Sequence, residues 1–268
     1  MGANSEINEV HTSRLGTQFE RVAAYLRDRD PHRRRSYWGY IDGNCERPAY
    51  ALNDSDQSVT FQSECLVPRD HRKRPKVLLL FSNAHPESIK NGMFHTAEGG
   101  IAALWTDLCL ADLFSGDCRI IGNADQLRAH CVRAEYEGPF AFGLACYWLF
   151  PTFDPSHLKP MFGSKMEPPG FEQTEQRFDR LLEDWKPVGI ICFNKTVFKQ
   201  LTDGDIGANV IERLRNEVIR SEYRMGDRAY PIFLTYPAGW RFDPNAGQLR
   251  QASLRRIAAI ILSAAGRQ

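Results

Sequence analysis

The sequence lacks the paired cysteine and histidine spacings that bind zinc or an iron–sulfur cluster. Its seven cysteines include no Cys-x-x-Cys pair, and an odd number without ligand spacing favours reduced thiols. No apolar run is long enough to span a bilayer, and the first ten residues contain no apolar signal region. We therefore expect a cytoplasmic protein without a zinc or iron–sulfur site.

Three common functional signatures are also missing: a Gly-rich phosphate loop, a nucleophilic Ser elbow and a helix that carries metal ligands. Neither charge is in marked excess, because 34 Lys and Arg offset 33 Asp and Glu. Basic residues do gather locally, at 31–36 and at 70–76. Such runs are either a solvated surface or contacts for phosphate groups.

The sequence does contain short apolar runs that alternate with amphipathic segments. The runs suit strands buried on both faces, and they lie at 76–81, 140–150, 188–193 and 230–236. Apolar residues at helical spacing predict helices at 98–114, 171–185, 195–201, 208–223 and 247–262. This alternation predicts a three-layer α/β/α sandwich with a central four-stranded parallel sheet.

The N-terminal part has a different character. Residues 15–29 predict one amphipathic helix, whereas residues 31–75 show no sustained period. The apolar side of that helix consists of Phe19, Val22, Ala23 and Leu26. We interpret residues 1–74 as a helical and irregular extension packed on a core domain formed by residues 75–268.

Open parallel sheets bind their ligands at the carboxyl ends of the strands. The loops expected there are 82–97, 151–170, 194–196 and 236–246. The first of them bends twice, once at Ser82–Pro86 and again at Asn91 and Gly92. Loop 151–170 is long and rich in Pro and Gly, which is typical of a lid, a binding loop or a mobile segment.

Three segments carry a family likeness. FSNAHP at 81–86 is followed at a distance by Gly92 and Phe94, ICFNKTVFKQL occupies 191–201, and LTYPAGWRF occupies 234–242. They are similar to the G-x-N-P-G or G-x-D-P loop, the F-N-G-K-x-x-Y segment and the H-P-S-x-L loop of one family. In this order and strand context, the chain resembles the uracil-DNA glycosylase superfamily over roughly residues 75–262, with some likeness to mismatch-specific members.

The resemblance implies a monofunctional DNA glycosylase of base excision repair. It would flip uracil out of single- or double-stranded DNA and hydrolyse the N-glycosidic bond, leaving an abasic site. The implied enzyme is a monomer that uses water as nucleophile and needs no cofactor. We expect no lyase step, because no Lys in these motifs is placed as a Schiff-base nucleophile.

The resemblance also assigns three catalytic candidates. Asn83 would orient the attacking water, and His85 would supply basicity near neutral pH. Tyr236 stands where the family has His and would donate a hydrogen bond to a base carbonyl. Each has a structural alternative: Asn83 as a cap of its loop, His85 as an ordinary loop histidine and Tyr236 as a packing residue at the strand end.

The base pocket is expected around the same loop. Phe94 would stack on the flipped base, its alternative being an ordinary core aromatic, and Ser82 flanks Asn83. The second strand lacks the Asn with which the family reads the pyrimidine edge, so another group must replace it. The candidates are Tyr136, Cys146, Tyr147 and Asn194.

The loop after the last strand is expected to face the DNA. Trp240 or Arg241 would fill the space left by the flipped nucleotide. The other expected DNA-binding residues are Lys195, Ala238 and Gly239. In this interpretation, Asn83 and Phe94 line one cavity and the Tyr236–Arg241 loop lies at its mouth.

Other functions stay open. One is a glycosylase for hypoxanthine or for mismatched thymine. Another is a catalytically silent DNA- or nucleotide-binding relative, favoured by Tyr236 and by the missing pocket Asn. The last is an unrelated α/β protein in which loop 82–97 covers a small-molecule site.

Overall fold

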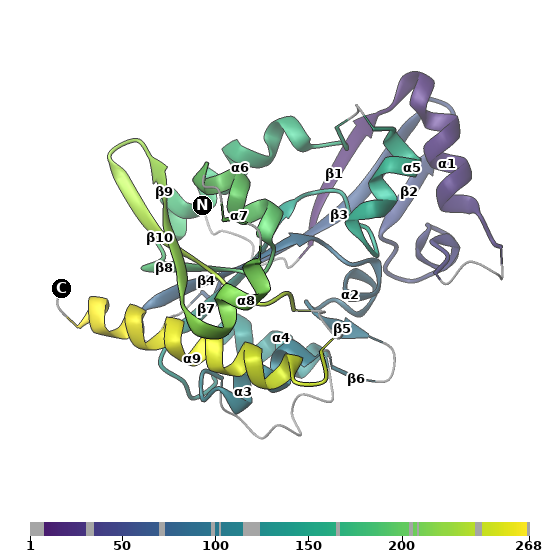
Figure 1. Ribbon diagram of the computed structural model, residues 1–268. Helices are drawn as coiled ribbons and strands as arrows, with labels where there is room; N and C mark the ends of the chain where they lie inside the picture. Colours follow the sequence, from purple (N-terminus) through teal and green to yellow (C-terminus); the bar gives the residue numbers. More distant parts are fainter. Residues whose placement is uncertain are drawn as a thin grey trace.

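A mixed sheet of eight strands forms the middle layer of the protein (Figure 1). The structure is a computed structural model that describes residues 8–30, 35–69, 73–97, 100–101, 103–114, 124–164, 167–203, 206–207, 209–238 and 243–266. The sheet order is β1–β3–β7–β4–β8–β10–β9, with β2 paired to β3. The strands are β1 (Asn8–Arg14), β2 (Tyr50–Asn53), β3 (Ser58–Leu66), β4 (Lys76–Asn83), β7 (Ala141–Trp148), β8 (Gly189–Cys192), β9 (Ile219–Met225) and β10 (Arg228–Leu234).

The four central strands, β7, β4, β8 and β10, run parallel to one another. Each comes from one of the apolar runs, because a strand covered by helices on both faces needs apolar side chains on both. Leu79 of β4, for example, is completely buried and aligns with Leu144 on β7 and Ile191 on β8. The predicted α/β class is confirmed, but the prediction of four strands is wrong, because the sheet has eight.

Antiparallel strands at both edges account for the difference. β9 pairs with β10, and β3 pairs with β7 through the Cys65–Ala145 and Leu66–Leu144 positions. Strands β1 and β2 both pair with β3. In β3, half-buried polar residues such as Gln62 lie among buried ones, so its sequence shows no clean period. The N-terminal extension therefore continues the sheet itself.

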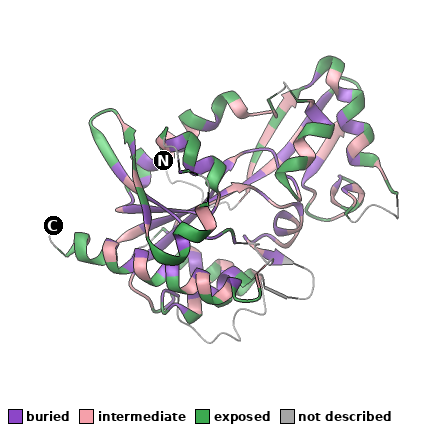
Figure 2. Cartoon of the chain, viewed as in Figure 1, coloured by how far each residue is buried: buried purple, intermediate pink, exposed green. Residues whose placement is uncertain are grey.

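Helices cover both faces of the sheet, and the strands between them are largely buried (Figures 1 and 2). On one face lie α3 (Ala103–Leu110), α4 (Ala124–Arg133) and the long α9 (Ala246–Ala265). On the other lie α6 (Phe171–Trp185), α7 (Lys195–Thr202) and α8 (Val210–Asn216). Near β1–β3, helix α1 (Phe19–Arg27) buries all four residues predicted for its apolar side. The short elements within the described residues include α2 (Pro86–Asn91), α5 (Leu158–Phe162), the β5 (Thr96–Ala97) and β6 (Gly100–Ile101) pair, and the 3-10 turns Gly16–Gln18, Trp38–Tyr40 and Pro155–His157.

The predicted helix at 208–223 is wrong in its second half. Helix α8 ends at Asn216, and β9 begins at Ile219. Ile219 and Tyr223 are buried, whereas Arg220 and Glu222 between them are exposed. This alternation is typical of a strand. Gly226, with φ of +55°, begins the tight turn that joins β9 to β10. The pairing across this hairpin outweighs the helix propensity of the glutamates and arginines.

Two further segments differ from the prediction made from the sequence. The predicted helix at 98–114 begins only at Ala103, because the preceding residues form the β5–β6 pair. Loop 151–170 contains a 3-10 turn and helix α5, and Met161 and Phe162 of α5 are buried. Helix α5 packs on α1, so this loop binds the N-terminal extension to the core.

A buried ion pair joins α9 to α3. Arg250 and Asp107 are both almost inaccessible, and Arg250 Nε donates to Asp107 Oδ2 at 2.6 Å. Gln251 Nε2 donates to the other carboxylate oxygen at 2.7 Å. Arg250 Nη1 also donates to the Pro237 carbonyl oxygen at 2.7 Å, so the pair fixes the chain that leaves β10.

Replacing Asp107 with Ala should lower the free energy of unfolding by about 3–5 kcal/mol, because Arg250 is left buried without its carboxylate. Urea denaturation measures this loss. Glu212→Ala removes an exposed partner of Arg215 and serves as the control, with an expected loss below about 1 kcal/mol. Equal effects of the two substitutions would show that the Arg250–Asp107 pair has no special importance for stability.

Candidate functional site

The first candidate residues meet at the carboxyl end of β4. Asn83 is the last residue of this strand, and His85 is the N-cap of helix α2. Pro86 occupies the first helical position, where its missing N–H costs no hydrogen bond. Helix α2 ends at Gly92, whose φ of +70° suits a left-handed C-cap. The two bends seen in the sequence are thus the start and the end of one short helix.

The Asn83 amide is held in one orientation. Its Nδ2 donates to Thr152 Oγ1 at 2.7 Å, to the Thr152 carbonyl oxygen at 2.9 Å and to the Ala84 carbonyl oxygen at 3.0 Å. The Thr152 N–H in turn donates to the Ala84 carbonyl oxygen at 3.0 Å. Because these acceptors surround the amide nitrogen, Oδ1 is turned away from them, where it is placed to accept a hydrogen bond from a ligand or a water.

The His85 imidazole lies between two donors. Its Nδ1 is 3.3 Å from the Glu87 backbone nitrogen, and its Nε2 is 3.2 Å from Nη1 of the exposed Arg35. A neutral imidazole has one acceptor nitrogen, so only one of these donors is satisfied at a time. Burial, and secondly the Arg35 charge, lower the pKa of His85 to about 4. The ring is therefore uncharged at neutral pH.

A buried carboxyl group lies beneath this loop. Glu64 of β3 is 2 % exposed and accepts the backbone N–H of His85. Its Oε1 is buried and has no hydrogen-bond partner among the described residues. Burial raises the pKa of Glu64 to about 8, so the group holds a proton at neutral pH.

Aromatic side chains border His85 on the side of the N-terminal extension. The half-buried Phe153 ring lies 5.1 Å from the His85 ring at an angle of 69°. Tyr37 Oη accepts the Phe153 backbone N–H at 3.1 Å and lies 2.8 Å from His157 Nδ1. Tyr37 thereby fixes the start of loop 151–170 beside the candidate site.

His95 belongs to the same region and was not predicted from the sequence. It lies just beyond Phe94 with φ of +50°, and its ring is 4.5 Å from that of Phe81. Burial lowers the pKa of His95 to about 3, and the charges of His85 and Arg250 lower it further. The sequence shows only that His95 follows His85 by ten residues, and this spacing belongs to no motif.

Phe94 does not lie where a base could stack on it. Its side chain is 1 % exposed and packs 5.7 Å from Phe81, which in turn stacks on Phe193 at 5.0 Å. These rings belong to the core on the α3 and α9 side. The expectation that Asn83 and Phe94 line one cavity is therefore not met, since protein atoms surround Phe94. Phe153 is the half-buried ring beside His85.

Three of the expected pocket residues are also part of the packing. Tyr136 lies at the opposite, amino end of β7, where its hydroxyl accepts the Phe142 N–H at 2.7 Å. Cys146 is buried on β7, and burial raises the pKa of its thiol well above the usual value. Tyr147 is buried on the other face against Phe178. No hydrogen bond or ring contact joins these three described side chains to the Asn83 region, so they form no base pocket with it.

Asn194 and Lys195 lie at the carboxyl end of β8. Asn194 is the N-cap of α7, and its Oδ1 accepts the N–H groups of Thr196 and Val197 at 2.9 and 3.1 Å. Capping therefore occupies the amide oxygen that would read a base edge. Lys195 is exposed and Ser82 is half-buried at the end of β4, so both are accessible as expected.

The loop after β10 is only partly described. Tyr236 is completely buried on the α6–α8 face, and its hydroxyl lies 3.4 Å from the Ile211 carbonyl oxygen. Burial raises the pKa of Tyr236. This location separates its side chain from Phe94 on the opposite face and corrects the expectation that the phenol faces the site. Ala238 is buried on the α9 side, and the predicted residues Gly239, Trp240 and Arg241 lie outside the described residues.

No protein-family model matches the chain, and no curated protein sequence matches it either. Within the described ranges, no cluster of His, Cys, Asp and Glu is arranged to hold a metal ion. In the same part of the chain, no helix has both the length and the apolar character required to cross a membrane. The glycosylase resemblance therefore stays a prediction from motifs.

The arrangement brings together three different chemical groups. Asn83 supplies an oriented acceptor, His85 an uncharged imidazole and Arg35 an exposed positive charge. The sequence predicted Asn83 and His85, and it marked loop 151–170 and the basic run 31–36 without singling out Thr152, Phe153 or Arg35. It gave no sign of Glu64. These partners of Asn83 and His85 come from segments outside 82–97. A periodic pattern in the sequence does not show which distant side chains the fold brings together.

Replacing Arg35 with Gln should raise the pKa of His85 from about 4 toward its ordinary value of 6.5, without reaching it, because burial is the larger cause. An NMR titration of the imidazole resonances measures this shift. Arg29→Gln removes a charge that stacks on Trp38 at 3.7 Å and serves as the control. An unchanged pKa in the Arg35 variant would contradict the contact.

Replacing Glu64 with Gln should stabilise the protein at alkaline pH. The folded-state pKa of about 8 lies above the ordinary 4.5, so the stability contributed by the protonated group is fully present below pH 4.5 and is lost progressively as pH rises from there through 8. Gln keeps the neutral form at every pH, so the variant should match the original near pH 4, gain relative stability as pH rises and reach its full advantage above pH 8. Urea denaturation across this range measures the difference, with the exposed Glu172→Gln as control. A pH-independent difference would rule out a titrating Glu64.

Proposed function

We propose that the protein is a monofunctional glycosylase that hydrolyses the N-glycosidic bond of uracil in DNA, acting as a cytoplasmic monomer without a cofactor. The observation that carries the proposal is the pairing of Asn83 and His85 at the carboxyl end of β4. This is the end of a parallel sheet at which ligands bind. An amide oxygen oriented by Thr152 and an uncharged imidazole stand next to each other there.

The proposed reaction needs little activation of the water. The C1′–N1 bond breaks with its electron pair leaving on uracil, and the sugar passes through an oxocarbenium-like transition state. Asn83 Oδ1 accepts a hydrogen bond from the water that adds to C1′. His85 takes the proton released from that water and passes it to solvent, and uracil takes its proton from solvent.

A movement of Arg35 would free the His85 imidazole to accept a proton. In the structure, the Glu87 N–H faces Nδ1 and Arg35 faces Nε2, and only the ring nitrogen without a proton can accept a hydrogen bond. Arg35 is exposed, and its guanidinium also lies 5.5 Å from the centre of the Phe153 ring. When substrate binds, Arg35 turns to a phosphate or to the oxygen of the departing uracil and leaves Nε2 to the water. Phe153 then offers the ring on which the base stacks.

The direct test is excision from labelled single- and double-stranded oligonucleotides that contain uracil, followed by cleavage of abasic sites with alkali. Strand cleavage that depends on uracil supports the proposal. A parallel panel with hypoxanthine and with mismatched thymine identifies a glycosylase for another base. The absence of product from every oligonucleotide would overturn the enzymatic proposal.

Asn83→Ala should lower the rate of uracil excision by about 100- to 1000-fold, the usual effect of removing one oriented polar group from an active site. Circular dichroism should show an unchanged fold, because Asn83 is only half-buried at the strand end. The matched control is Asn216→Ala, at the exposed end of α8. Full excision by the Asn83 variant would remove this residue from the mechanism.

A silent DNA-binding relative is the second candidate. Its support is Tyr236, which stands at the family's His position but is buried with its hydroxyl toward Ile211. The Asn expected in the base pocket is also absent from β7. Salt-dependent binding of uracil-containing DNA without any release of base would favour this alternative.

A further inference from the structure

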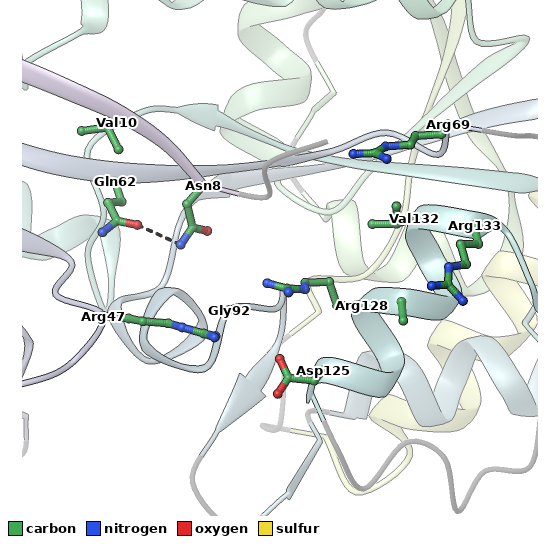
Figure 3. A pocket seen from close by; sticks show the side chains of 11 residues that line it. Asn8, Val10, Arg47, Gln62, Arg69, Gly92, Asp125, Arg128, Val132 and Arg133 are labelled. Atoms are coloured by element: carbon green, nitrogen blue, oxygen red, sulfur yellow. Dashed lines mark hydrogen bonds between the residues drawn. The ribbon is translucent and has the colours of Figure 1, made fainter. Parts of the chain in front are cut away.

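A groove lined by arginines lies between the β1–β3 edge of the sheet and helix α4 (Figure 3). Its volume is about 540 Å³. The charged residues that line it are Arg47, Arg69, Arg128, Arg133 and Asp125. They come from the N-terminal extension and from α4, and none of them belongs to the candidate site around Asn83.

Among the described residues, little negative charge compensates the arginines of this groove. Arg47, Arg69 and Arg128 form no ion pair with any described residue, and Asp125 is the one carboxylate among the lining residues. Arg133 lies 3.7 Å from Glu135 at an exposed position, a pair of little energetic weight. Like charges gathered in one concave surface repel each other and favour an anionic ligand.

Two of the arginines converge on the turn that ends α2. A Cβ placed on Gly92 would lie 2.3 Å from Arg47 Nη1 and 3.7 Å from Arg128 Nη1. Arg47 Nη1 also lies 3.5 Å from the Asn91 carbonyl oxygen. The absence of a side chain at Gly92 therefore allows both guanidinium groups to approach the same point from opposite walls.

Helix α2 links the groove to the candidate site. Helix α2 carries His85 at its N-terminus and Gly92 at its C-terminus. Its six residues span about 9 Å. Along one strand of a DNA duplex, about 9 Å corresponds to two or three nucleotides. A strand whose reacting nucleotide lies at Asn83 therefore brings its neighbouring phosphates to the arginines.

We propose that this groove binds the phosphodiester backbone of the DNA strand on one side of the reacting nucleotide. The direction of the strand rests on the proposed function, whereas the binding of a polyanion rests on the groove alone. The arginines are spread along the groove, with Arg69 and Arg133 at one end and Arg47 at the other (Figure 3). This spread suits several phosphates in series, each bound by a planar guanidinium. A single nucleotide would engage only one end.

The groove is tested by fluorescence anisotropy of the full chain with a labelled oligonucleotide over a range of salt concentrations. Arg47→Gln and Arg128→Gln should each weaken binding about 5- to 10-fold. Each should also reduce the slope of log affinity against log salt by about 0.7–0.9 for every phosphate that is no longer neutralised. Arg224→Gln, an exposed arginine on β9 at the other edge of the sheet, is the matched control and should change neither value. Affinity and slope that stay unchanged in the Arg47 and Arg128 double variant would overturn the proposal.

Two further arms separate this proposal from related ones. A deoxynucleotide monophosphate should compete only at concentrations far above those of the oligonucleotide, and equal competition would assign the groove to a small ligand instead. The Asn216→Ala variant, at the exposed end of α8, should bind the oligonucleotide as tightly as the original chain. If uracil is never excised but the arginine variants still bind more weakly, the glycosylase function fails while the groove stands. If excision proceeds and the arginine variants bind normally, only the groove is overturned.

Discussion

The buried pair of Arg250 and Asp107 is the constraint on which the rest of the carboxyl edge depends. A guanidinium and a carboxylate removed from water must satisfy each other, and they do so across two helices that lie far apart in the sequence. The remaining Arg250 donor goes to the Pro237 carbonyl oxygen, so the chain leaving β10 is held to α9. The same charge helps to keep His95 neutral. One ion pair thus joins two helices and the chain that leaves β10.

The candidate site is assembled from both parts of the chain. The core supplies Asn83 and His85, while the N-terminal extension supplies Glu64 beneath the loop and Arg35 beside the imidazole. Tyr37 adds the hydrogen bond that fixes Phe153. Strand β3 therefore does more than lengthen the sheet, because the carboxyl group of its Glu64 accepts the backbone N–H of His85.

The sequence predicted the strands and helices that are encoded by local patterns of apolar residues. The four parallel strands are continuous apolar runs, and α1 and α6 repeat their apolar residues at helical spacing, so the sequence alone predicts each of them. Strand β9 is predicted as a helix because its charged residues suit either element, and its pairing partner decides between them. The position of Asn83 follows from the strand that carries it. Phe94 and Tyr236 could not be placed, because a motif gives the order of residues but not which face of the sheet a side chain enters.

Three titratable groups around Asn83 carry no negative charge at neutral pH, because Glu64 is protonated and His85 and His95 are neutral. A nearby carboxylate is Asp154, whose pKa is lowered by its hydrogen bonds to Ser156 and, more weakly, by the charges of His157 and Arg35. Arg35 is present beside them, and Arg47 and Arg128 lie one short helix away without ion-pair partners among the described residues. Donors also outnumber acceptors at the His85 ring. Such a surface is complementary to a ligand that offers hydrogen-bond acceptors and negative charge. A nucleic-acid strand offers both, through its phosphates and the carbonyl oxygens of its bases.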